Sequence, residues 1–162
     1  MKAAVLTLSD KGSRGEREDL SGPALEQFLT QRGVTVVRTA VIPDDAITIS
    51  ETLAAWADEG AMELILTTGG TGVAPRDVTP EATMTVVDRI IPGFGEEMRR
   101  ASAAKTPHAW ISRAIAGIRG RCLIINLPGS PRGAVENLEA VWAAIPHAVA
   151  KIQGDPEDCA VP

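Results

Sequence analysis

The sequence predicts an α/β protein, a three-layer sandwich with a mainly parallel sheet and helices on both faces. Short apolar runs of strand length alternate with amphipathic stretches of helical length, which is the order that crossover connections between parallel strands produce. Polar or glycine-rich segments follow several of the apolar runs, at the edge where open α/β sheets bind ligands. With 162 residues, 44% of them hydrophobic and 23% charged, residues 1–162 are expected to form one domain.

The first half of the chain contains three short runs of aliphatic and β-branched residues, as buried strands do. These expected strands lie at residues 3–8, 34–42 and 62–67. The polar, glycine-rich residues 9–19 are expected to form a loop. A helix is expected from Ser21, with Pro23 in its first turn, and a second amphipathic helix after the acidic pair Asp44-Asp45.

The second half continues with helices and one clear strand. A helix is expected to begin with Thr79 as its cap and Pro80 in its first turn. Pro92-Gly93 is expected to break the chain before the next helix, and residues 110–118 fit a helix and a strand equally well. The remaining expected elements are a helix at 94–104, a buried strand at 122–127 and a last helix from about 134 to 152.

The composition limits the partners and the location of the protein. Aromatic residues make up 3% of the chain and the net charge is −5, so no nucleic-acid partner is expected. No run reaches transmembrane length, and the N-terminus is too polar for a signal peptide. The two cysteines, Cys122 and Cys159, lack metal-ligand spacing and suggest a reducing compartment. We therefore expect a cytoplasmic protein without a membrane partner.

A glycine-rich stretch, LTTGGTGVAPRDVTPEAT from Leu66 to Thr83, joins the third expected strand to a helix. It has neither the Walker A pattern nor the dinucleotide fingerprint. Backbone N–H groups can still approach a phosphate where no Cβ blocks them, and a strand–turn–helix junction favours an anion. We expect four residues of this loop to bind the phosphates of a nucleotide: Gly69, Gly70, Thr71 and Gly72.

Two aspartates are candidates to hold a metal ion beside these phosphates. Asp77 lies within the glycine-rich stretch, and Asp44 follows the second expected strand. The first three strands are expected to be neighbours, which brings both carboxylates to one end of the sheet. Mg²⁺ binds through one or two carboxylates together with substrate phosphates. The alternatives are local, because Asp44 or Asp45 can cap the following helix and Asp77 can bond within its own turn.

Three other side chains of this region have open alternatives. Thr67 and Thr68 either face the ligand or are strand residues with satisfied hydroxyls, and Thr68 is included in the expected binding site. The guanidinium of Arg76 can bind a phosphate with two hydrogen bonds. It can equally form an ion pair with Glu81 or with the neighbouring Asp77.

These segments together resemble the MogA/MoaB-like molybdopterin-binding family, and most closely its adenylyltransferases, including the plant and animal G domains. The resemblance covers nearly the whole chain. It rests on the motifs SGPAL, IPDD, TTGGTG, PRDVTPEAT, PGFGEEMR, SRAIAGIRG and LPGSP. It implies the α/β fold of that family and a homotrimer.

The resemblance also implies an activity. The phosphate of molybdopterin attacks the α-phosphate of ATP, which yields adenylylated molybdopterin and pyrophosphate and requires Mg²⁺. The product then goes to molybdate insertion, so a handover to a molybdate-insertion protein is expected. The essential aspartates of the family fall on Asp44 and Asp77. The residue chemistry agrees, because transfer between two anions needs charge neutralisation and alignment more than a covalent protein group.

Two more segments are assigned by the resemblance. Ser112, Arg113 and Gly117 resemble the segment that meets the pterin, where a hydroxyl and a cation suit the pterin phosphate. Pro128-Gly129-Ser130 resembles a second glycine-containing loop near the adenosine. The prolines alone would also explain this loop as an ordinary turn that ends a strand.

Three functions are therefore weighed. The first is a molybdopterin adenylyltransferase. The second is a MoaB-type binding protein that keeps the pterin site with little or no adenylyl transfer. The third is an unrelated α/β nucleotide-binding regulator that shares only the glycine loop. The presence of both Asp44 and Asp77 favours the first.

Overall fold

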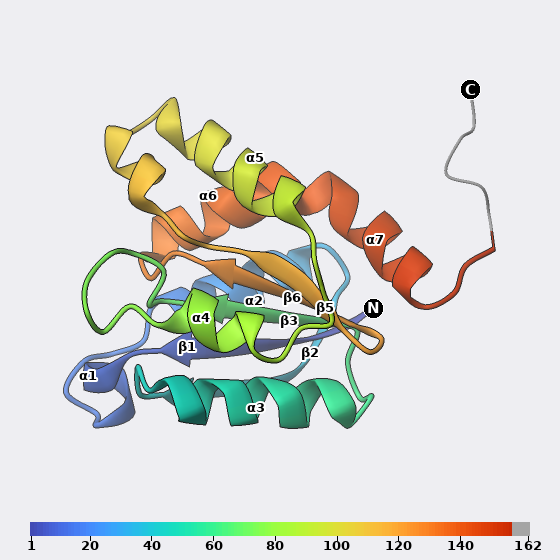
Figure 1. Cartoon of the computed structure of the whole chain (residues 1–162), viewed down its shortest axis with the longest axis horizontal. Coiled ribbons are helices and arrows are strands. Elements are labelled where there is room, and N and C mark those ends of the chain that lie inside the picture. The colour runs from blue at the N-terminus through green and yellow to red at the C-terminus, as the bar shows by residue number, and fades with distance from the viewer. Residues whose placement is uncertain (157–162) are drawn as a thin grey trace.

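A six-stranded sheet runs through the computed structural model, which describes residues 1–156 (Figure 1). The strand order is β2-β1-β3-β6-β5-β4; the first four run parallel, β5 is antiparallel to β6, and β4 is antiparallel to β5. The predicted mainly parallel sheet is confirmed. The strands are β1 (Lys2–Leu8), β2 (Thr35–Ile42), β3 (Leu64–Thr68), β4 (Arg89–Ile90), β5 (Ala116–Arg119) and β6 (Cys122–Leu127).

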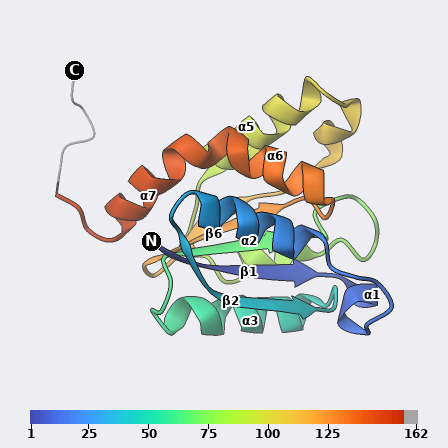
Figure 2. The same cartoon turned by 180° about the vertical axis from the view of Figure 1, so that it is seen from behind.

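Helices cover both faces of this sheet, as predicted (Figures 1 and 2). One face carries α2 (Ser21–Gln31), α5 (Pro92–Ala103), α6 (Pro131–Val141) and α7 (Ile145–Ile152). The other face carries α3 (Ala46–Asp58) and α4 (Thr79–Met84). Three short elements complete the described chain: α1 (Asp10–Ser13) and the 3-10 helices η1 (Pro107–Ile111) and η2 (Trp142–Ala144).

The hydrophobic core lies in two layers, one on each side of the sheet. Along β1, Ala3 and Val5 pack in the layer of α2 and α6, whereas Ala4 and Leu6 pack in the layer of α3 and α4. Strands covered on both faces need apolar residues at every position, which explains why the central strands read as continuous apolar runs.

The carboxyl ends of four parallel strands meet at one edge of the sheet. Thr7 near the end of β1 pairs with Thr68 at the end of β3, and Thr68 pairs in turn with Leu127 at the end of β6. The loops after β1, β2, β3 and β6 therefore lie together, and Figure 1 shows α1 and the loop from β3 to α4 at this edge. Open α/β sheets bind their ligands at such an edge.

Several expected elements differ in detail. The segment predicted as a loop after β1 contains α1, because the Ser9 hydroxyl accepts a hydrogen bond from Gly12 N and caps it. Pro92-Gly93 does not break the chain before a helix but begins α5, since a first-turn proline has no intrahelical N–H bond to lose. The expected last helix is split into α6, η2 and α7, with Pro146 in the first turn of α7.

The ambiguous segment 110–118 resolves into two elements, the end of η1 and most of β5. The short strand β4 was not expected, because two residues carry no periodic pattern. None of the described helices is both long and apolar enough to cross a membrane. Cys159 lies outside the described residues.

Candidate functional site

The loops at the carboxyl edge enclose a cavity of about 580 Å³. Segments after β1, β2, β3 and β6 all contribute to its wall, as the parallel topology requires. Seven of the residues predicted for the site line this cavity: Asp44, Thr68, Gly69, Gly70, Asp77, Gly129 and Ser130.

Asp44 is not the cap of the helix that follows it. The carboxylate of Asp45 takes that role, with Oδ1 accepting hydrogen bonds from Thr48 N at 2.9 Å and from Thr48 Oγ1 at 2.7 Å. The capping alternative for Asp44 is therefore wrong. Its half-buried carboxylate lines the cavity instead.

Asp10 and Arg76 hold Asp44 in place. Asp10 N donates to Asp44 Oδ2 at 2.9 Å, and Asp44 N donates to Asp10 Oδ1 at 3.1 Å. Arg76 binds the Asp10 carboxylate through Nε at 3.0 Å and Nη2 at 2.7 Å. Of the partners weighed for Arg76, neither Glu81 nor Asp77 is correct, because the fold brings α1 against the glycine loop.

The pKa values of Asp10 and Asp44 are shifted in opposite directions. Arg76 lowers the pKa of Asp10 by bonding to its carboxylate. Burial raises the pKa of Asp44, and the negative charges of Asp10 and Asp77 raise it further. A positive ion between Asp44 and Asp77 would offset this repulsion.

The glycine loop turns sharply because two of its residues have positive φ. Gly69 has φ +110° and Gly70 has φ +62°, a region that favours glycine. A Cβ on Gly69 would overlap Leu8 O, and one on Gly70 would overlap Thr79 Oγ1. Thr79 is not the cap of α4 but its first residue; its hydroxyl donates to Gly69 O at 2.9 Å and fixes the turn.

The same loop passes close to both carboxylates. A Cβ on Gly70 would lie 3.2 Å from Asp44 Oδ1, and a Cβ on Gly72 would lie 2.8 Å from Asp77 Oδ2. Asp77 Oδ2 also accepts a hydrogen bond from Ala74 N at 2.8 Å, so the turn-bond alternative for Asp77 holds alongside its place in the cavity. Gly70 and Gly72 thus bring the backbone of the loop close to Asp44 and Asp77 respectively.

This arrangement fits a magnesium ion that is completed by substrate oxygens. Within residues 1–156, no group of three or more His, Cys, Asp and Glu side chains is placed to hold a metal ion by itself. Mg²⁺ in phosphoryl-transfer sites commonly binds through one or two carboxylates plus phosphates and water. Asp44 and Asp77 can supply the two carboxylates.

The two threonines before the glycines have satisfied hydroxyls, as the second alternative proposed. Thr68 Oγ1 donates to Pro128 O at 2.7 Å, and Thr67 Oγ1 accepts from Asn126 Nδ2 at 3.0 Å. Asn126 also donates to Thr83 Oγ1 at 2.9 Å. These bonds tie β3, β6 and α4 together beneath the cavity.

A second cavity of about 300 Å³ lies on the other side of the glycine loop. Residues of α5, η1 and α6 line it, among them Arg99 and Glu136, together with Lys105 from the connection between α5 and η1. Five predicted site residues also line it: Thr71, Gly72, Ser112, Pro128 and Ser130. Ser130 is common to both cavities, so the two spaces adjoin at the loop after β6.

Three predicted site residues line neither cavity: Arg76, which pairs with Asp10 as described above, Arg113 and Gly117. Arg113 donates to Gly72 O and to Asp77 O and pairs with Glu81. Gly117 lies in β5, where a Cβ would come within 2.9 Å of Arg89 O. Close strand packing accounts for this glycine, and its predicted contact with a pterin stays a prediction.

Sequence reasoning missed Asp19, which lines the first cavity. Its Oδ1 accepts hydrogen bonds from Ser21 N and Gly22 N, both at 3.0 Å, and its Oδ2 accepts from Thr7 Oγ1 at 2.7 Å. An aspartate just before a helix start is a capping signal that could have identified it. Arg17 is the single cation among the residues that line this cavity.

Comparisons with known proteins identify a family and several similar proteins. The family model described as "Probable molybdopterin binding domain" matches residues 4–147. Molybdopterin adenylyltransferase from Helicobacter pylori strain J99 is 45% identical over 153 residues, which cover 93% of this chain and 87% of that protein. The Escherichia coli K12 protein of the same name is 40% identical over 168 residues, covering 95% and 86%. The crystal structure of the molybdopterin biosynthesis enzyme MoaB from Thermus thermophilus superposes with a TM-score of 0.89 at 48% identity, covering 97% of this chain and 99% of that one.

Proposed function

The chain belongs to the molybdopterin-binding domain family, and we propose that it is a molybdopterin adenylyltransferase. It transfers AMP from ATP to the phosphate of molybdopterin and releases pyrophosphate. One observation carries the proposal most directly: Asp44 and Asp77 line one cavity together with the glycine loop that runs between them. The curated relatives that bear this activity in their names are 40–45% identical over most of the chain.

The first cavity is proposed to hold ATP. Gly69, Gly70 and Gly129 line this cavity without side chains, so their backbone can approach the phosphates closely. Asp44 and Asp77 hold Mg²⁺, which supplies positive charge where two anions must meet. The protein's own task is to align the α-phosphate with the incoming phosphate and to limit the freedom of both. The attacking group is already an anionic phosphate oxygen, so the reaction needs no histidine base.

The second cavity is proposed to hold molybdopterin. It combines apolar surface with polar groups of Ser102, Ser112 and Asn137, which suits a flat heterocycle with donors and acceptors at its edges. Its wall shares Thr71 and Gly72 with the glycine loop. A pterin seated there would direct its phosphate toward that loop, where the ATP phosphates are expected.

A second candidate function is MoaB-type binding of molybdopterin with little or no adenylyl transfer. The observation that favours it is the similarity to the Thermus thermophilus structure, which is described as MoaB and is 48% identical. Both functions use the same second cavity, and they differ in whether the first cavity supports turnover.

We further propose that residues 1–162 form a single domain, a cytoplasmic homotrimer that hands its product to a molybdate-insertion protein. Large apolar side chains on the surface support an assembly, because Val73, Trp110 and Ile111 are 64%, 65% and 51% exposed. Sedimentation analysis tests this part, and a monomer at micromolar concentration would contradict the trimer.

The activity is tested by incubating the protein with molybdopterin, ATP and Mg²⁺ and measuring adenylylated pterin and pyrophosphate. Product formation supports the transferase. Bound pterin without product above background favours the MoaB-type function instead. Asp77→Asn keeps the shape of the side chain but removes its negative charge. It should therefore abolish turnover and leave the circular dichroism spectrum unchanged. Unchanged turnover would remove Asp77 from the mechanism.

A further inference from the structure

We propose that Arg113 and Glu81 form a clamp that holds the glycine loop in its ligand-binding shape. Arg113 is then a positioning residue for the nucleotide site and not a contact for the pterin phosphate. This inference rests on the proposed function for the identity of the ligand. Its basis is the set of contacts that Arg113 makes on the outer side of the loop.

Arg113 closes the loop at both of its ends. Its backbone N donates to Thr71 O at 2.9 Å, and its Nε donates to Gly72 O at 2.6 Å. Its Nη2 donates to Asp77 O, which lies at the far end of the turn. One planar guanidinium therefore fixes two backbone carbonyls, those of Gly72 and Asp77, with four residues between them.

Glu81 holds the guanidinium in this position. Its carboxylate pairs with Arg113 Nη1 from the exposed first turn of α4. Each of the three guanidinium nitrogens thus already donates to protein, and neither Arg113 nor Glu81 lines the two cavities described above. Three of the five guanidinium N–H groups of Arg113 are therefore engaged in shaping the loop, and the side chain faces neither cavity wall.

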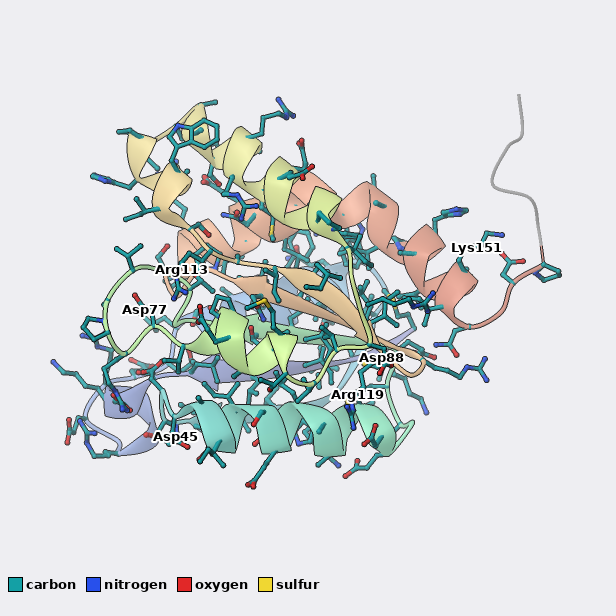
Figure 3. The ribbon with its side chains drawn as sticks, viewed as in Figure 1. Asp45, Asp77, Asp88, Arg113, Arg119 and Lys151 are labelled. Atoms are coloured by element: carbon teal, nitrogen blue, oxygen red, sulfur yellow. The ribbon has the colours of Figure 1, made fainter. Side chains whose placement is uncertain are left out.

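The clamp determines where the Asp77 carboxylate points. Asp77 N donates to Ala74 O at 2.9 Å, and Asp77 Oδ2 accepts from Ala74 N at 2.8 Å. With Arg113 on Asp77 O, this turn has little freedom to rotate. Figure 3 shows Arg113 and Asp77 close together at the site edge of the sheet. Releasing the clamp should therefore weaken the nucleotide and metal site through Asp77, and it should affect the second cavity less, because the clamp reaches that wall only through Thr71 and Gly72.

The chain offers a matched control in Arg119. This arginine also pairs with a carboxylate, Asp58 at 2.8 Å, and donates to a backbone carbonyl, Val86 O at 2.8 Å. Figure 3 shows it beside the labelled Asp88 at the opposite end of the sheet from Arg113. Arg119→Lys should disturb a similar set of bonds away from both cavities.

The experiment compares Arg113→Lys, Glu81→Gln and Arg119→Lys in three measurements. Amide hydrogen exchange of residues 70–77 is followed in the ligand-free protein, and calorimetry measures binding of a non-hydrolysable ATP analogue with Mg²⁺ and, separately, of molybdopterin. We expect Arg113→Lys and Glu81→Gln to accelerate loop exchange and to weaken nucleotide binding about tenfold, the effect of losing one or two net hydrogen bonds. Molybdopterin binding should weaken less than nucleotide binding and to a similar extent in both variants, because the second cavity shares only Thr71 and Gly72 with the clamped loop. Arg119→Lys should alter none of the three measurements.

Two results would overturn the clamp. One is unchanged loop exchange and unchanged nucleotide binding in both variants. The other is weaker molybdopterin binding in Arg113→Lys but not in Glu81→Gln, which would make Arg113 a pterin contact. If Arg113→Lys fails to fold, the exposed Glu81→Gln variant decides alone. If the wild-type protein binds no nucleotide, the proposed function fails, whereas loop exchange still decides whether the clamp exists.

Discussion

The glycine at position 70 provides a sharp test of how the loop is built. Gly70→Ala adds one methyl group at a residue with φ +62°. The methyl carbon would overlap the buried Thr79 Oγ1 and would lie 3.2 Å from Asp44 Oδ1. Thr79 Oγ1 cannot move away freely, because it donates to Gly69 O at 2.9 Å.

The expected loss of stability has two parts. A non-glycine residue in the left-handed region costs about 1–2 kcal/mol. Forcing an extra carbon into a packed site costs about 1–3 kcal/mol more. The free energy of unfolding should therefore fall by about 2–5 kcal/mol, the sum of these two contributions.

Gly60 separates the two parts. It has φ +67°, close to that of Gly70, but a Cβ added there meets no atom within 4 Å. Gly60→Ala should cost only the conformational part, about 1–2 kcal/mol. Urea unfolding followed by tryptophan fluorescence measures both variants, and the difference between them is the cost of the overlap.

A double-mutant cycle tests the identity of the clashing atom. Thr79→Ala removes Oγ1 and loses one buried hydrogen bond, which costs about 1 kcal/mol. Combined with Gly70→Ala, it removes the overlap, so the double variant should be more stable than additivity predicts by about 1 kcal/mol or more. The close approach of a residue-70 Cβ to Thr79 Oγ1 would be refuted if the two changes in unfolding free energy were strictly additive. It would also be refuted if Gly70→Ala were as stable as Gly60→Ala.

Three further outcomes are expected from the contacts described. Asp10→Asn removes a negative charge that adds to the effect of burial in raising the pKa of Asp44. The pKa of Asp44 should therefore fall in this variant. Mg²⁺-dependent nucleotide binding, measured by calorimetry, should then persist to lower pH than in the wild type. Unchanged acid dependence would show that Asp44 does not control the binding. Burial raises the pKa of the Cys122 thiol to about 12, so a maleimide should modify this residue only after unfolding. Mass spectrometry of peptides measures the labelling, and labelling of the folded protein would contradict this prediction. Ser130→Ala removes the cap bond from Gly133 N to Ser130 Oγ and should lower the unfolding free energy by about 1 kcal/mol. Urea titrations measure this change, and an unchanged unfolding free energy would exclude a capping role.

The fold was largely predictable because local patterns and topology agree. The central strands are continuous apolar runs since both faces of the sheet are covered, and the helices between them impose parallel pairing. The predictions that were wrong concern where short helices begin, which depends on local capping residues and prolines. Ser9 can cap a short helix within a polar segment, and Pro146 can begin α7 within one long amphipathic pattern. Neither outcome is fixed by periodicity.

The sequence by itself determined which residues are available for chemistry: a glycine loop after a strand, and aspartates in the segments that follow two parallel strands of one sheet. Only the tertiary structure decided how these groups are partnered. Asp44 and Asp45 are adjacent and chemically identical, yet Asp45 bonds to Thr48 within its own helix and Asp44 bonds to Asp10 from another loop. Arg76 and Arg113 are equally cationic, and the fold pairs the first with Asp10 and the second with Glu81. The physical reason is that hydrogen bonds between distant segments depend on where the loops meet, and sheet topology sets that place independently of local sequence.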